Sequence, residues 1–179
     1  MFTVATISIP ERREGLLAAM QSVANQTYGP VPHLIRVEQP DQFGTQHVTR
    51  QRIALMGAVQ TPWLAVLDDD DQFHPSYLER MAAAIDASPD AAVAYSYCYG
   101  HEHAEGPFDG ERLQRENYID GEACINVGWL NLAGGYQLQE QGLVEDWDLW
   151  KRIHALGGQF VCVPERLRFH GRAPRNVTG

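Results

Sequence analysis

The chain of 179 residues is poor in lysine and in long apolar segments, and each deficit excludes a class of protein. Lys151 is its only lysine, and 14 basic residues against 23 acidic ones give a formal charge of −9. There is no basic stripe to bind a nucleic-acid backbone, and an anionic surface disfavours anionic membranes. No apolar run is long enough to span a bilayer, and strand-like residues follow Met1 with no signal peptide. We therefore expect a cytoplasmic protein.

Cysteine is also scarce. The three cysteines, Cys98, Cys124 and Cys162, are odd in number and far apart in the sequence, and each lies among apolar or small residues. They are typical of reduced core residues rather than of a disulfide or zinc framework. The glycine fingerprints of P-loop and dinucleotide-binding proteins are missing as well, which disfavours a kinase or a dehydrogenase.

What the chain does contain is an alternation of strand-like and helix-like segments. Its length and its 44% hydrophobic content suit one compact domain. The order predicts an α/β fold with a parallel, doubly wound sheet and ligand sites at the carboxyl ends of the strands. We expect strands at residues 2–8, 33–38, 63–67, 91–97, 159–163 and 166–170, helices at 11–24, 48–59, 75–87 and 144–156, and a polar loop at 100–121.

Four consecutive carboxylates, Asp68 to Asp71, follow the apolar segment 63–67. Successive side chains of an extended segment alternate, so Asp68 and Asp70 should point to one side and Asp69 and Asp71 to the other. Like charges this close repel one another, and a hard divalent cation with oxygen ligands would neutralise them. The run predicts a metal site with open positions for a diphosphate. The alternative is a solvated acidic turn that caps the next helix.

A second acidic cluster, Glu145 and Asp146, stands at the start of the predicted helix 144–156. Carboxylates in a first helical turn face the positive end of the helix dipole, which keeps them ionised and able to accept a proton. An acid here that also reached a cleft would suit a general base. The alternative is that these are ordinary first-turn acids beside a packed apolar face.

Taken together, four motifs resemble the family 2 glycosyltransferases, which are inverting nucleotide-sugar enzymes with the GT-A fold. Residues 7–12 and 22–28 resemble the first strand of that family, its proline-containing nucleotide loop and its helix end. Residues 67–75 match the metal-binding D-x-D segment, and residues 142–150 match the element that supplies the catalytic base. Residues 169–171 resemble the late histidine of the family.

The resemblance extends from residue 2 to about residue 172. It implies one glycosyltransferase domain over residues 1–179, with 1–99 as the nucleotide-sugar half and 100–179 as the acceptor half. The implied reaction is metal-dependent and inverting, from a nucleotide-sugar donor to the hydroxyl of a glycan, protein or small-molecule acceptor. Residues 100–140, or another subunit as in a homodimer, would supply the acceptor platform.

The resemblance also assigns the chemistry to individual residues. Asp146 would be the catalytic base. The cation, Mn²⁺ or Mg²⁺, would be held chiefly by Asp70, with Asp68 close to the ribose or the metal. His170, helped by Arg172, would complete the metal or diphosphate shell, although a simple hydrogen-bonded histidine is an equal alternative.

In the same way, the resemblance predicts the donor contacts. Pro10, Arg12 and Glu38 lie where the family holds the nucleoside, and Asp69 belongs to the same donor site. Arg50 or Arg52 would contact the base or a phosphate. The chain departs from the family by having glutamate 38 in place of the usual aspartate, and its Arg-Gln-Arg triplet at 50–52 allows two registers.

Two other classes share part of the pattern. A haloacid-dehalogenase-like phosphatase also places D-x-D after a strand, with Asp68 as nucleophile, but it needs Thr or Val where Gln72 stands, and a lysine other than Lys151. A non-enzymatic calcium-binding module would use Asp68, Asp70 and Glu79 at loop positions one, three and twelve, but an EF-hand loop follows a helix rather than a strand. Neither alternative explains the second acidic cluster.

Overall fold

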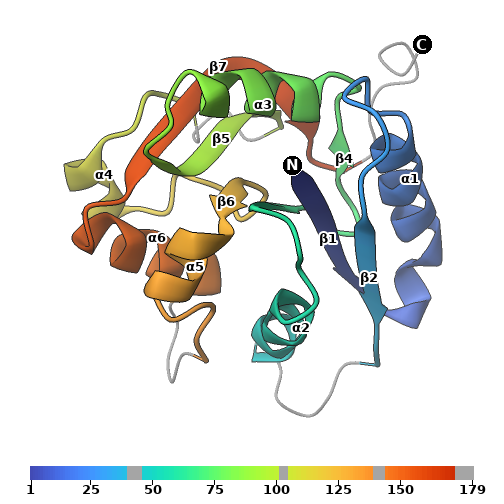
Figure 1. Ribbon diagram of the computed structural model, residues 1–179. Coiled ribbons are helices and arrows are strands. Elements are labelled where there is room, and N and C mark those ends of the chain that lie inside the picture. The colour runs from blue at the N-terminus through green and yellow to red at the C-terminus, as the bar shows by residue number, and fades with distance from the viewer. Residues whose placement is uncertain (40–45, 101–104, 139–143, 172–179) are drawn as a thin grey trace.

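The computed structural model describes residues 1–39, 46–100, 105–138 and 144–171, which form one α/β unit around a curled sheet (Figure 1). The sheet has seven strands in the order β2-β1-β3-β6-β5-β7-β4. The strands are β1 (Phe2–Ser8), β2 (His33–Val37), β3 (Trp63–Val66), β4 (Gln72–Phe73), β5 (Ala91–Tyr99), β6 (Cys124–Asn126) and β7 (Gln159–Phe169). The helices are the 3₁₀ turn η1 (Pro10–Arg12), α1 (Arg13–Ala24), α2 (Gln46–Met56), α3 (Tyr77–Asp86), α4 (Gly110–Arg115), α5 (Val127–Leu132) and α6 (Glu145–Ala155).

The sheet is mostly parallel, as the alternation of segments predicts. The long registers, β1 with β2, β1 with β3, and β5 with β7, are all parallel. The antiparallel exceptions are β6, which runs between β3 and β5, and β4, which pairs with β7. Both strands are too short to show a hydrophobic period, so the sequence pattern could not reveal them.

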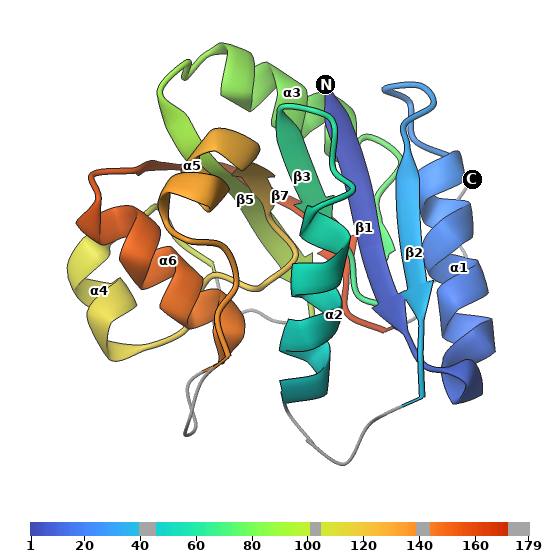
Figure 2. The ribbon, with the colours of Figure 1, turned by 60° about the horizontal axis from the view of Figure 1, so that its bottom comes forward.

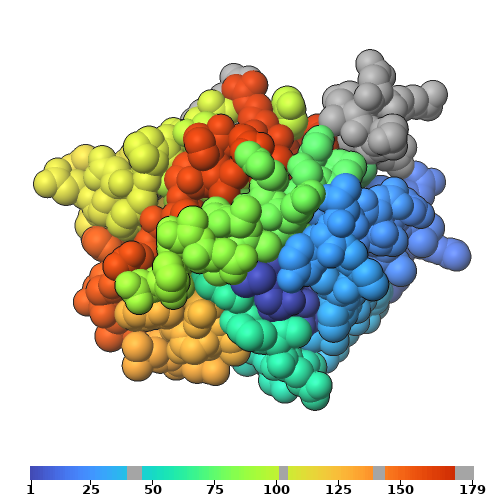
Figure 3. Space-filling model, turned by 45° about the horizontal axis from the view of Figure 1, so that its top comes forward, coloured from blue at the N-terminus to red at the C-terminus, as the bar shows by residue number. Residues whose placement is uncertain are grey.

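Helices cover both faces of the sheet (Figure 2). Along β3, Trp63 and Ala65 belong to the core shared with α1 and α3, whereas Leu64 and Val66 belong to the core shared with α5 and α6. This alternation follows from the two-residue period of a strand that is buried on both sides. In the space-filling view, α3 (green) lies at the surface of the molecule, with β7 (red) on one side and blue amino-terminal segments on the other (Figure 3).

The carboxyl-terminal half departs most from the sequence-based expectation. Residues 100–121, predicted to be a loop, contain α4, whose first turn is capped by the Asp109 carboxylate. The two strands predicted at 159–163 and 166–170 are a single strand, β7, whose register against β5 skips between Val163 and Arg166. Pro164 has no N–H to donate, which explains why the pattern looked interrupted there. None of the helices in the described ranges is long and apolar enough to cross a membrane.

Candidate active site

The carboxyl ends of three parallel strands meet at one edge of the sheet and form a pocket there. β1, β2 and β3 end at Ser8, Val37 and Val66, and the residues that follow each strand lie around the same opening. The pocket has a volume of about 180 Å³. Its lining comes from β1, η1, α2 and the segment after β3, namely Ile7, Ser8, Ile9, Arg12, His47, Val48, Gln51, Asp68 and Asp69.

The four carboxylates alternate between the protein interior and the solvent, although Asp69 and Asp70 form a turn closed by a 3.3 Å hydrogen bond from the Asp71 N–H to the Asp68 carbonyl. Asp69 and Asp71 are buried, whereas the side chains of Asp68 and Asp70 are 40% and 51% exposed. The buried Asp69 is fully engaged, because it accepts a hydrogen bond of 2.6 Å from the Ser8 hydroxyl and one of 3.0 Å from Arg12. The exposed pair is therefore the one available to a ligand.

Arg12 connects the first loop to the carboxylates. Its Nη1 lies 3.0 Å from Asp69 and 3.1 Å from Asp70. The hydrogen bond to Asp69 and the charge of the same group raise the pKa of Arg12. Helix α1 also comes close to this segment, since a Cβ on Gly15 would lie 2.5 Å from the backbone oxygen of Asp69. Only glycine permits that approach, which holds the start of α1 against the carboxylates.

The exposed carboxylates match the donor type that Mg²⁺ and Mn²⁺ prefer. Within the described ranges, no three His, Cys, Asp or Glu side chains converge to hold a metal ion. Asp68 and Asp70 are the exposed oxygen donors of this segment that could hold such an ion. His170 lies beside the buried Asp71, with 3.3 Å between its Nδ1 and the carboxylate. Arg172 lies outside the described residues.

The second acidic cluster is at the start of α6, as predicted. Asp146 is only 7% exposed, and its Oδ1 accepts hydrogen bonds of 3.1 Å from the Asn117 amide and 2.5 Å from the Trp147 N–H. Burial raises the pKa of Asp146 to about 7, even though the positive charge of Arg52 opposes the shift. A carboxylate with such a pKa is suited to accept a proton near neutral pH.

Arg52 brings the two acidic clusters together. Its Nη2 lies 3.0 Å from Asp68, and its Nη1 lies 2.7 Å from Glu145. The candidate base Asp146 lies near Arg52. Both side chains border Gly121, because a Cβ on that residue would lie 3.1 Å from Arg52 Nη1 and 3.1 Å from Asp146 Oδ2. Residues that are far apart in the sequence thus form one continuous site.

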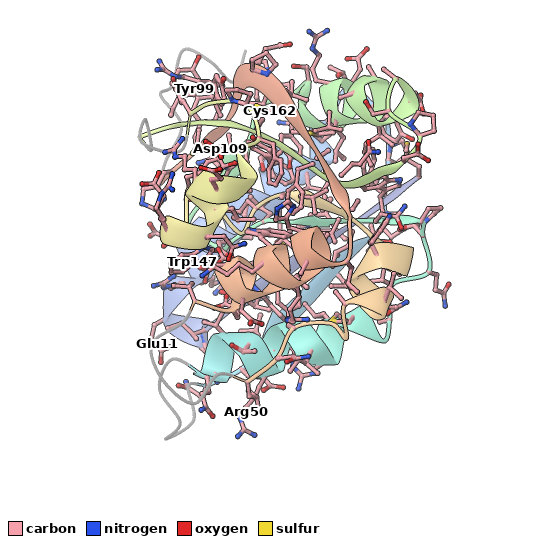
Figure 4. The ribbon with its side chains drawn as sticks, turned by 90° about the vertical axis from the view of Figure 1, so that its left-hand side faces the viewer. Glu11, Arg50, Tyr99, Asp109, Trp147 and Cys162 are labelled. Atoms are coloured by element: carbon pink, nitrogen blue, oxygen red, sulfur yellow. The ribbon has the colours of Figure 1, made fainter. Side chains whose placement is uncertain are left out.

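The remaining residues predicted to contact the nucleotide-sugar donor lie in different surroundings. Pro10 opens η1 and is exposed, and Glu38 follows β2 and accepts a hydrogen bond from the buried Gln51, which lines the pocket. Arg50 is exposed and projects outward from α2 (Figure 4). Of the two arginines proposed as alternatives, only Arg52 therefore reaches the carboxylates.

Sequence reasoning missed a third group, which lies behind the Asp run. The buried Arg168 of β7 pairs with Asp120 and Glu122, each at 2.7 Å. Asp71 shares a hydrogen bond with Glu122 and accepts another, of 2.8 Å, from the N–H of Gly171. Burial raises the pKa of Asp71 and of Glu122. The two acids on either side of Gly121 were a signal, but nothing local indicated their partner.

Solved structures with the same fold include several of S. aureus TarS. TarS 1-349 superposes with a TM-score of 0.70 at 12% identity, over 96% of this chain and 60% of that one. TarS 1-349 in complex with UDP gives 0.70 at 13%, over 97% and 61%, and its complex with UDP-GlcNAc gives 0.69 at 10%, over 99% and 60%. The chain thus spans about 60% of the length of TarS 1-349. At this identity the likeness shows the fold, which is GT-A.

No curated protein sequence is significantly similar to the chain. The model of the family described as "Glycosyl transferase family 2" matches residues 42–146. This match includes α2, the Asp run and the acidic pair at the start of α6. Because it spans more than half of the sequence, the chain belongs to glycosyl transferase family 2.

Proposed function

We propose that the protein is an inverting, metal-dependent glycosyltransferase that moves a sugar from a nucleoside diphosphate donor to an acceptor hydroxyl. The observation that carries the proposal is the joining of the two acidic clusters through Arg52. One cluster, with Asp68 and Asp70, offers exposed oxygen ligands beside the pocket at the sheet edge. The other offers Asp146, a buried carboxyl whose pKa is raised to about 7.

In the proposed reaction, Asp146 takes the proton of the acceptor hydroxyl while that oxygen attacks the anomeric carbon of the sugar. The new bond joins the acceptor oxygen to this carbon, and the bond from the carbon to the diphosphate oxygen breaks with its electron pair. Attack from the side opposite the diphosphate inverts the anomeric configuration. General-base assistance of this kind typically contributes about 10²- to 10⁴-fold to the rate.

The donor half supplies binding and orientation. The pocket beside Arg12 would take the nucleoside, with Pro10 and Glu38 at its edge and Gln51 in its wall. Asp68 and Asp70 would hold Mn²⁺ or Mg²⁺, a cation that would neutralise the departing diphosphate. His170 lies beside the same segment, because its Nδ1 is 3.3 Å from the carboxylate of Asp71. TarS is known in complex with UDP and with UDP-GlcNAc, which supports a UDP-sugar as the first donor to test.

The test is a thermal-shift screen of UDP-, GDP-, dTDP- and CMP-sugars with and without Mn²⁺. A ligand that binds only the folded state raises the melting temperature, so one nucleotide class should stabilise the protein, and only with the metal. Transfer of the sugar, with the product anomer assigned by NMR, would then establish inversion. A protein that binds no nucleotide sugar, or a product with retained configuration, would contradict the proposal.

The metal assignment has its own variant. Asp70→Ala should abolish Mn²⁺-dependent binding of the nucleoside diphosphate, because the exposed carboxylate pair loses a ligand, while the fold is kept since Asp70 is half exposed. Calorimetry of the variant would be compared with Asp90→Ala, an exposed acid far along the chain. Unchanged diphosphate binding by Asp70→Ala would show that the metal assignment is wrong.

A further inference from the structure

Arg52 is a buried cation at the point where the donor side and the base side of the site meet. Only 7% of its side chain is exposed. Each of its two terminal nitrogens is committed to a different carboxylate, Asp68 after β3 and Glu145 at the start of α6. Its guanidinium carbon also lies 5.6 Å from the ring centroid of Tyr136. A planar fork with several donors is the side chain best suited to join two such groups.

This placement does not suit a residue that binds the nucleotide. Its two Nη atoms are already paired with Asp68 and Glu145, and an ion pair with a buried partner is costly to break. Arg12, in contrast, is 53% exposed and lies at the pocket. The charges around Arg52 also favour a permanent cation. Burial alone would lower its pKa, but the surrounding charges, with Asp68 the largest among them, raise it instead.

We propose that Arg52 is a positioning residue that holds the donor-side carboxylate Asp68 and the base-bearing start of α6 in one fixed arrangement. The inference rests on the proposed function, because it concerns the same reaction. The contacts that link the two sides run from Asp68 through Arg52 to Glu145, the neighbour of Asp146. Gly121 lies beside both side chains, since a Cβ there would be 3.1 Å from Arg52 Nη1 and 3.1 Å from Asp146 Oδ2.

Arg52 also sets the electrostatic environment of the base. The groups that face Asp146 are Arg52 from α2, Glu145 from α6 itself, Tyr136, and the amide of Asn117. Among these, only the guanidinium is positive. Its charge lowers the pKa of Asp146, whereas the Glu145 carboxylate raises it. Loss of this cation would therefore make Asp146 harder to ionise, and the base form would be reached only at higher pH.

Two substitutions separate geometry from charge. Arg52→Lys keeps the positive charge but replaces the two-pronged fork with a single ammonium, and Arg52→Gln removes the charge. The matched control is Arg80→Gln, on an arginine of α3 that is 49% exposed. For each protein we would measure calorimetric binding of UDP-GlcNAc with Mn²⁺, release of UDP with water or an added acceptor alcohol, and the pH dependence of that rate.

We expect Arg52→Lys to lose about 10²-fold in kcat with donor affinity nearly unchanged, since small displacements of a reacting group have effects of this size. Arg52→Gln should lose at least as much, and its rate profile should also move to higher pH. Arg80→Gln should match the wild type. If Arg52→Gln does not fold, Arg52→Lys alone decides through the split between kcat and donor affinity.

Two results would overturn the inference. If both Arg52 variants kept the wild-type kcat and pH profile, the bridge would have no part in positioning. If they lost donor affinity in proportion to rate, Arg52 would be a donor contact. The proposed function fails separately, because in that case the wild-type protein itself would release no UDP and transfer no sugar.

Discussion

Two buried arginines, Arg52 and Arg168, lie at the two ends of the Asp run, and each pairs with two carboxylates. The Arg52 cluster opens to the pocket, since the side chain of Asp68 is 40% exposed and lines it. The Arg168 cluster is closed, because its partners Asp120 and Glu122 are only 15% and 7% exposed. The two clusters have the same composition of one cation and two acids, but they differ in access to solvent.

This difference in solvent access shows how ion pairs of the same composition can have different roles. In the closed cluster, burial raises the pKa of Glu122 and of Asp71, and Arg168 compensates the charge of its two acidic partners inside the protein. Its result is a rigid connection between β7 and the end of the Asp run. In the open cluster, Asp68 keeps a face toward the pocket, and a ligand can use its charge. The first arrangement supports the fold, whereas the second can support chemistry.

The largest expected effect tests the chemical role of the open cluster. Asp146→Asn removes the proton acceptor and keeps the shape of the side chain, so transfer should slow by about 10²- to 10⁴-fold with little change in donor affinity. Asp148→Asn is the matched control, because Asp148 lies on the same helix but pairs with Arg152. Transfer rates and donor binding would be measured for both. Full activity in Asp146→Asn would remove the base assignment, and lost donor binding would make Asp146 a donor-site residue.

The next effect tests the structural role of the closed cluster. Arg168→Met leaves Asp120 and Glu122 buried without their cation, and breaking a buried pair in this way typically costs about 3–5 kcal/mol in free energy of unfolding. Arg166→Met, two residues earlier on β7, removes a more exposed pair with Glu105 and should cost at most about 1 kcal/mol. Urea denaturation would give both values. Equal losses in the two variants would show that the closed cluster contributes no more to the free energy of unfolding than the more exposed pair does.

The smallest effect, expressed per pH unit, is on the stability of the metal-free, donor-free protein. The pKa of Asp146 is about 7 in the folded state and 3.8 in the reference state, so between these values only the folded protein keeps the proton. The contribution of Asp146 to the free energy of unfolding should therefore fall by about 1.4 kcal/mol per pH unit as the pH rises through this window, and it should level off above the folded-state pKa.

Asp146→Asn should remove this slope and leave the contribution of the closed cluster, where the raised pKa of Glu122 acts in the same direction. The difference between wild type and variant, measured by denaturation at several pH values, thus separates the two clusters. An identical slope in both proteins would mean that Asp146 does not hold a proton in the folded state.

Several features of the site could be predicted from the residues alone because they depend on local geometry. The alternating exposure of Asp68 to Asp71 matches the prediction although the segment forms a turn, and the start of α6 at Glu145 follows from a first turn rich in acids above an apolar face. β3 was evident because a strand buried on both faces is continuously apolar. Likewise, the gathering of donor-side residues at one sheet edge follows from the parallel order of β1, β2 and β3.

Other elements of the fold gave too little local signal. β6 is three residues long, and α4 and α5 are six residues each. Asn126 caps α5 by accepting hydrogen bonds from two N–H groups, and Asp109 caps α4 in the same way. These caps were the local indications of the two helices that could have been recognised. The reversed direction of β6 depends on its pairing with β3 and β5, which are distant in sequence.

The sequence by itself thus determined the α/β class, the acidic clusters and the edge of the sheet at which they gather. Only the tertiary structure decided which arginine joins them, and it assigned Arg52 to Asp68 and Glu145 and left Arg50 exposed. It also paired Arg168 with Asp120 and Glu122 behind the same segment. The physical reason is that a backbone period is set by neighbouring residues, whereas a buried ion pair is set by which distant segments pack together and exclude water.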